Sequence, residues 1–134
     1  MIKSLDTNIC IEIIRGTSPL ARNRLAQHRA GELVISSIVY FELMTGAEKS
    51  GNSQKSRQLV QELSNRIAIE DFSQEDAGMA ARIRATLEAS GRSIGPMDML
   101  IAGQALCRGY AVATNNVREF SRIPGLICED WLIA

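Results

Sequence analysis

Short apolar runs alternate along the chain with longer segments whose apolar residues recur at the spacing of an amphipathic helix. The short runs predict strands, and the longer segments predict helices because capping residues such as Ser36 and Ser73, or a stop such as Gly109, fall at their ends. The predicted strands are Met1–Leu5, Leu33–Ile35, Ile67–Ile69, Tyr110–Thr114 and Leu126–Cys128. The predicted helices are Ile9–Arg15, a polar helix from Pro19 to His28, Ile38–Glu48, Gln54–Asn65, Ser73–Gly91, Pro96–Arg108 and the turn Val117–Phe120.

Strands that alternate with helices are typical of a parallel sheet with helices on both faces. The pattern therefore predicts an α/β protein, a three-layer α/β/α sandwich with a short, mostly parallel central sheet. The chain has 134 residues and contains no linker, internal repeat or low-complexity tract. We expect a single domain over residues 1–134, large enough to bury its own core.

Composition narrows the classes of function. The 15 basic residues balance the 15 acidic ones, so the protein lacks the overall positive charge of a strong nonspecific nucleic-acid binder. Its three cysteines, Cys10, Cys107 and Cys128, are far apart and form neither a disulfide framework nor a zinc motif. The chain starts with a strand-like run and has no apolar stretch of membrane-spanning length, so we expect a cytoplasmic protein without membrane association.

Three acidic residues stand alone within apolar segments. Asp98 is the only charge from Ser93 to Cys107, Glu42 the only charge from Leu33 to Ala47, and Asp6 the only charge from Ser4 to Ile11. Each has an ordinary structural explanation: a helix cap for Asp6, a favourable helix dipole for Asp98, and an ion pair with a distant arginine for Glu42. Burying a carboxylate costs several kcal/mol unless it is paired, and a shared polyvalent cation would pair all three at once.

The predicted topology brings these acids to one edge of the sheet. Parallel strands end at the same edge, where ligands bind in such sheets. Asp6 follows the first strand, and the turn from Asn115 to Glu119 follows the fourth. The helix carrying Asp98 leads into a strand and therefore begins at this edge, while Glu42 lies about 7 to 8 Å into a helix that departs from it.

Carboxylate and amide oxygens without histidine or cysteine ligands favour a hard cation, Mg²⁺ or Mn²⁺, over zinc. Such an ion lowers the pKa of a bound water and neutralises a phosphate, which predicts phosphodiester hydrolysis. The single histidine, His28, excludes catalysis by a histidine pair, and its polar surroundings predict a surface residue. The glycines form no phosphate-binding loop, which argues against ATP use.

Four segments occur in a fixed order along the chain: Leu5–Asn8, Ser36–Leu43 with Gly46, Ile94–Ala102 and Thr114–Phe120, followed by Ile123–Gly125 and Glu129–Trp131. Together they make the chain similar to the PIN-domain ribonucleases of the VapC toxin group. The match extends over essentially the whole sequence, and only the combination of segments is specific. Met97 and Gln104 depart from the group's usual aromatic residue and histidine.

This resemblance implies a Mg²⁺-dependent endoribonuclease, with Mn²⁺ able to substitute, that is the toxin of a bacterial toxin-antitoxin pair. It implies a homodimer silenced by a VapB-like antitoxin, and an RNA substrate that in some members is tRNA, including the anticodon loop of initiator tRNA. The residues that it implicates are Asp6, Glu42, Asp98 and Glu119 as catalytic metal ligands, and Asn116 and Thr114 as supporting groups.

Arg15, Arg92 and Arg118 flank the motifs and are candidate RNA contacts. Two other functions stay open from the sequence. A structure-specific DNA nuclease would use the same chemistry, although the chain lacks a long insertion for threading a DNA end. A catalytically inactive binding module would use the acids to pair with basic side chains of a partner.

Overall fold

The computed structural model describes residues 1–134 and has a five-stranded, fully parallel sheet at its centre. The strand order is β3-β2-β1-β4-β5, so the first strand of the chain is the middle strand of the sheet. The strands are β1 (Lys3–Leu5), β2 (Leu33–Ser36), β3 (Ala68–Glu70), β4 (Ala111–Thr114) and β5 (Cys128–Asp130). The predicted parallel α/β fold is confirmed.

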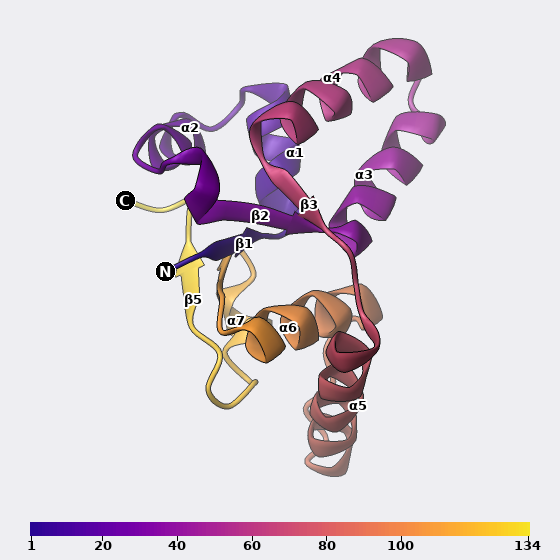
Figure 1. Cartoon of the computed structure of the whole chain (residues 1–134), viewed down its shortest axis with the longest axis vertical. Helices are drawn as coiled ribbons and strands as arrows, with labels where there is room; N and C mark the ends of the chain where they lie inside the picture. The colour runs from indigo at the N-terminus through magenta and orange to yellow at the C-terminus, as the bar shows by residue number, and fades with distance from the viewer.

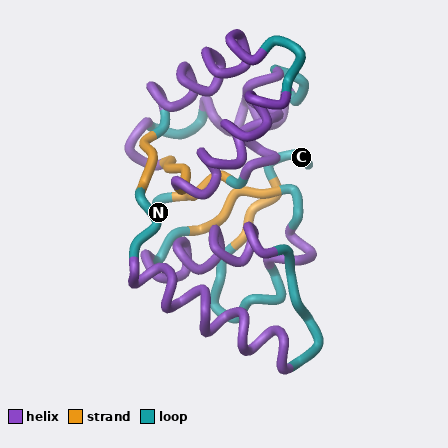
Figure 2. Tube along the Cα trace, turned by 90° about the vertical axis from the view of Figure 1, so that its right-hand side faces the viewer, coloured by secondary structure: helices purple, strands orange, loops and turns teal.

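Helices cover both faces of this sheet. Figure 1 shows α1 to α4 on one side and α5, α6 and α7 on the other, and the view in Figure 2 shows the strands between these layers. The predicted three-layer sandwich is therefore confirmed. The helices are α1 (Thr7–Arg15), α2 (Pro19–Ala26), α3 (Ser37–Lys49), α4 (Ser53–Arg66), α5 (Gln74–Ala89), α6 (Pro96–Arg108) and α7 (Val117–Phe120), with a 3₁₀ turn, η1, at Ala30–Glu32.

The predicted caps define the helix ends. The Ser36 hydroxyl accepts a hydrogen bond from the Ile38 amide at the start of α3. Ser73 and Asp76 exchange side-chain-to-backbone hydrogen bonds at the start of α5, an arrangement that satisfies two amides of the first turn. Gly109 ends α6 with a left-handed φ of 72°, which a residue with a side chain adopts only at a cost.

The hydrophobic core is continuous through the central strands. Leu5 of β1, Ile35 of β2 and Val112 of β4 are almost completely buried, as is Ile101 of α6. These strands are covered on both faces, which explains why they read as uninterrupted apolar runs. None of the helices combines the length and the apolar character that crossing a membrane requires.

The last strand differs from its prediction. It comprises Cys128–Asp130 rather than Leu126–Cys128, although the carbonyl of Ile127 already accepts from the Val112 amide. Two acidic residues therefore lie in an edge strand. The charge of Glu129 is compensated, because Glu129 forms an ion pair with Lys3 at 2.9 Å.

His28 is also not the surface residue of a polar helix that the sequence predicted. It follows the end of α2 and is half-buried, and its ring stacks on Trp131 with ring centroids 5.2 Å apart. Its Nδ1 lies 2.6 Å from the Arg24 carbonyl and its Nε2 lies 2.9 Å from Lys3 Nζ. The partner Trp131 is remote in the sequence, so local polarity could not reveal this packing role.

Candidate active site

Asp6 lies at the end of the central strand β1, where α1 begins, and is only 3% exposed. One carboxylate oxygen accepts from the Ile9 amide at 2.9 Å and caps the helix, as the structural alternative predicted. The other oxygen accepts from the Thr114 hydroxyl at the end of β4. The pKa of Asp6 is raised to about 6, mainly by burial, with a smaller contribution from the negative charges of Asp98 and Glu42, while the two hydrogen bonds oppose the increase.

Glu42 extends from α3 toward the same edge. Its Oε1 accepts from the Thr7 hydroxyl at 2.5 Å, and Thr7 directly follows Asp6 in the chain. None of the ion pairs in the structure includes Glu42, so the alternative of a distant arginine partner is wrong within this chain. Thr7 is the residue that the sequence analysis missed, because a threonine after an aspartate at a helix start looks like part of a cap.

Asp98 and Glu119 are linked by one amide side chain. Asn116 Nδ2 lies 3.4 Å from Asp98 Oδ2 and also donates to Glu119 Oε2. Burial raises the pKa of Asp98, and the charges of Glu119 and Glu42 add to this increase. The backbone amide of Asn116 donates to Thr114 Oγ1 at 2.8 Å. The Thr114 hydroxyl thus connects this turn to Asp6.

These contacts bring the four predicted acids to one edge of the sheet. The charges of Asp98 and Glu42 raise the pKa of Asp6, and the charges of Glu119 and Glu42 raise the pKa of Asp98. No lysine or arginine forms an ion pair with any of them. The four chain segments therefore meet at this edge, as the topology predicts, and the assignment of their acids as the catalytic site stays a prediction.

The donor set fits a hard divalent cation, because the side chains that hydrogen-bond one another at this edge carry carboxylate, hydroxyl and amide groups. No three acidic, histidine or cysteine side chains lie close enough together to form a ready-made ligand cluster. One or two carboxylates and several waters usually hold Mg²⁺, so a Mg²⁺ site does not require such a cluster.

The predicted arginines occupy two different places. Arg15, at the end of α1, lines a groove of about 210 Å³ between α1, α3 and α4, together with Glu42 and apolar residues. Arg92 and Arg118 line a separate polar pocket. Gln104, where the group usually has a histidine, is buried and donates to the backbone carbonyls of Glu70 and Asp71.

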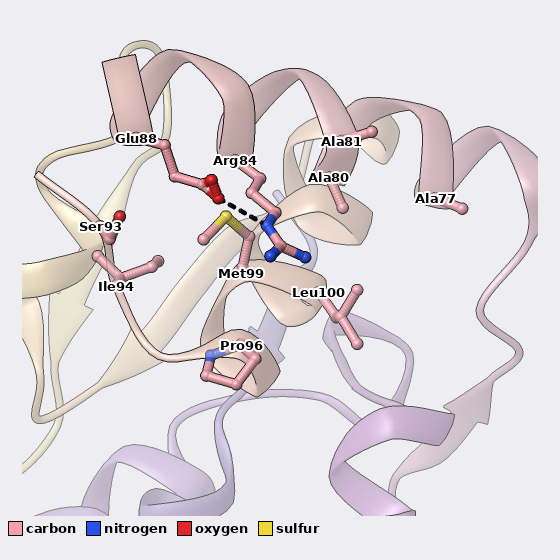
Figure 3. A pocket seen from close by; sticks show the side chains of 10 residues that line it. All are labelled: Ala77, Ala80, Ala81, Arg84, Glu88, Ser93, Ile94, Pro96, Met99 and Leu100. Carbon is pink, nitrogen blue, oxygen red and sulfur yellow. Dashed lines mark hydrogen bonds and ion pairs between the residues drawn. The ribbon is translucent and has the colours of Figure 1, made fainter. Parts of the chain in front are cut away.

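A hollow of about 550 Å³ lies between α5, the loop before α6 and the start of α6. Figure 3 shows the side chains that line it, with Met99 below the Arg84–Glu88 ion pair. None of the four acids belongs to its wall, although Pro96 and Met99 are chain neighbours of Asp98.

Known proteins resemble this chain over nearly its full length. The PIN domain family profile matches residues 3–126. The "tRNA(fMet)-specific endonuclease VapC" of Shigella flexneri is 41% identical over 127 residues, which are 95% of this chain and 96% of that protein.

Solved structures agree with this. In the crystal structure of DNA-bound VapBC from Salmonella typhimurium, a chain that is 40% identical superposes with a TM-score of 0.92 over 98% of both chains. In VapBC2 from Rickettsia felis bound to a promoter DNA fragment, the matching chain is 37% identical, with a TM-score of 0.91 over 98% of this chain and 99% of that one. Sequence and backbone thus give the same answer: the chain belongs to the PIN domain family, in its VapC ribonuclease group.

Proposed function

We propose that the protein is a Mg²⁺-dependent endoribonuclease of the bacterial cytoplasm, the toxin of a toxin-antitoxin pair, and that its substrate is tRNA, with the anticodon loop of initiator tRNA as the cut site. The observation that carries the proposal is the group of four acids without a basic partner at the carboxyl edge of the sheet. The name of the Shigella relative supports the choice of initiator tRNA.

Asp6 and Asp98 are the residues we assign as direct ligands of Mg²⁺, or of Mn²⁺ in its place, because burial and neighbouring charge raise the pKa of both. Glu42 and Glu119 would complete the set of acids that holds the cation. When bound, such a cation neutralises phosphate charge and lowers the pKa of water at the cleavage site.

The polar residues around the acids hold them in place before a substrate arrives. The Thr114 hydroxyl donates to Asp6, and the Thr7 hydroxyl donates to Glu42. Asn116 holds Asp98 and Glu119 at the same time. Carboxylates restrained in this way lose little conformational freedom when a cation and a phosphate bind, which is how neighbouring groups preorganise a site.

We propose that a VapB-like antitoxin binds in the groove between α1, α3 and α4. Apolar residues of three helices line it, and Glu42 belongs to its wall, so a segment lying there would cover one of the acids. Basic residues of that segment would pair with the acids and silence them. The homodimer stays a prediction, to be checked by light scattering of the isolated chain.

The test is cleavage of in vitro transcribed initiator tRNA by the purified chain. We expect cutting with millimolar Mg²⁺, none with EDTA, and a loss of at least about a hundredfold in Asp6→Asn, because the site loses a charged metal ligand. Asp71→Asn, an exposed aspartate outside the site, is the matched control and should cut normally. Equal cutting by Asp6→Asn would refute the site, cutting of structured DNA alone would favour the DNA nuclease, and no cutting at all would favour the binding module.

A further inference from the structure

Three arginines form a polar pocket next to the segments that carry the acids. The pocket measures about 450 Å³, and neither an apolar nor an acidic side chain belongs to its wall. Arg92 and Arg118 are exposed, and Arg122 is half-buried. The pocket, hereafter the arginine pocket, is lined by Gly91, Arg92, Arg118, Ser121 and Arg122.

The positive charge of the arginine pocket is not compensated within the chain. Other basic residues, such as Arg57, Arg84 and Arg108, pair with carboxylates at 2.5 to 3.0 Å. None of the three pocket arginines forms such a pair. Guanidinium groups around one hollow repel each other, and a bound anion would remove that repulsion.

The arginine pocket is built by the same two segments that deliver Asp98 and Glu119. Arg118 precedes Glu119 in α7, and successive side chains of a helix point about 100° apart. Glu119 can therefore face the acids while Arg118 faces the arginine pocket beside them. The loop that leads into α6 carries Arg92. Arg122 Nη1 donates to the Ser93 carbonyl at 2.9 Å and ties this loop to the end of α7.

From this geometry we infer that the arginine pocket binds a backbone phosphate of the RNA, adjacent to the phosphate that is cut at the acids. The inference rests on the proposed function. Guanidinium groups offer forked donors that match phosphate oxygens, which makes arginine the preferred residue for such contacts. Because every nucleotide carries the same phosphate, the pocket orients the RNA and does not read its sequence.

An acidic segment of a protein partner would offer similar chemistry. The position of the pocket favours RNA, because the chain segments around it lead directly to Asp98 and Glu119 and not to the apolar groove between α1, α3 and α4. Arg122 was not a candidate from sequence. Its role appears only when the α7 segment is folded against the loop before α6.

The test compares binding of labelled initiator tRNA, over a series of NaCl concentrations, to Asp98→Asn protein with and without Arg92→Ala, Arg118→Ala and Arg122→Ala. The Asp98→Asn change prevents cutting during the measurement. We expect the three arginine changes to weaken binding at least about tenfold and to reduce the slope of log affinity against log salt by about 1, because the one phosphate held by the pocket loses its partners. With Asp98 intact, KM should rise while kcat changes little.

The matched control removes three arginines elsewhere: Arg57→Ala, Arg66→Ala and Arg82→Ala. It carries the same net charge and should keep the salt slope. Equal weakening by both triple variants would overturn the inference, since it would reflect overall charge alone. Lost binding of the antitoxin with unchanged binding of tRNA would overturn it as well, in favour of a protein contact. A wild-type protein that cuts no RNA would instead refute the proposed function, so the two failures are distinguishable.

Discussion

Asp6 shows how one residue can serve the fold and the chemistry together. It caps α1 through one oxygen, and its other oxygen lies against Thr114. The capping explanation and the metal-site explanation are therefore compatible. Yet a cap at a helix start is normally exposed, whereas Asp6 is 3% exposed and next to other acids, so its charge costs free energy that a cap alone would not require.

This cost makes the stability of the metal-free protein depend on pH. The pKa of Asp6 is about 6 in the fold and 3.8 ordinarily, so the folded state holds the proton more tightly than the unfolded state. Ionised Asp6 thus destabilises the fold by about 3 kcal/mol well above pH 6, and protonation removes that cost as the pH falls from about 6 toward 4.

We therefore expect Asp6→Asn to stabilise the metal-free protein, and to do so less at pH 5 than at pH 7, by on the order of 1 kcal/mol. Urea unfolding in EDTA at both pH values measures the difference. Asp71→Asn, whose side chain is exposed, should show no such trend. An Asp6→Asn protein that gains equal stability at both pH values would mean that Asp6 is ionised throughout.

Thr114 offers a second test at the residue scale, because its hydroxyl donates to the Asp6 carboxylate and helps to lower its pKa. Thr114→Val keeps the shape and removes the donor. We expect the acid limb of the pH–activity profile to move to higher pH and the Mg²⁺ concentration for half-maximal cleavage to rise severalfold. Thr45→Val is the matched control, since its hydroxyl bonds a carbonyl on the surface of α3. An unchanged profile in Thr114→Val would remove Thr114 from the site.

Among the elements, the α5–α6 pair positions Asp98. The two helices pack more extensively than any other pair, and Gly103 of α6 lies directly against Ala80 of α5. A Cβ on Gly103 would lie 2.6 Å from the Ala80 Cβ and 2.7 Å from its Cα, closer than atoms can approach. The glycine therefore sets the spacing of the helices, and with it the place where α6 begins.

Gly103→Ala is expected to destabilise the protein by about 1 to 3 kcal/mol, because backbone atoms of α5 must move to accommodate the methyl group. Adding Ala80→Gly should recover part of the loss, and a double-mutant cycle in urea measures this coupling. Gly78→Ala, on α5 with open space at its Cβ, is the control and should stabilise by up to about 1 kcal/mol. A neutral Gly103→Ala would show that the two helices can separate freely.

Most elements could be predicted from the sequence because their signals are local. Caps such as Ser73 and stops such as Gly109 lie within one turn of the helix end that they determine. The exceptions depend on distant partners. The strand Cys128–Asp130 contains acids that Lys3 neutralises, and Arg108 at the end of α6 joins Glu70 and Asp76 in a network that no local pattern shows.

At the scale of the whole molecule, some residues of the candidate site could likewise be predicted from local signals, and others depend on contacts between distant segments. Asp6, Glu42 and Asp98 could be found because a lone charge in an apolar segment is conspicuous. Glu119 lies in a polar turn and needed the family resemblance. Thr7 and Arg122 act through contacts made only in the fold, with Glu42 and with the Ser93 carbonyl, so spacing could not identify them.

The site is assembled from four segments, so a cation that binds it should stabilise the entire fold. Under the proposed function, Mg²⁺ would bind the folded chain and not the scattered acids of the unfolded one, and at 100 times its dissociation constant it would add about 2.7 kcal/mol. For a chain of this size we expect the melting temperature to rise by about 10 °C.

NaCl at equal ionic strength should give a much smaller change, because screening alone only weakens the repulsion among the acids. The Asp98→Asn variant should lose most of the Mg²⁺ effect. A melting temperature that is flat up to tens of millimolar Mg²⁺ in the wild type would mean that the acids hold no cation, and their raised pKa values would then need another explanation.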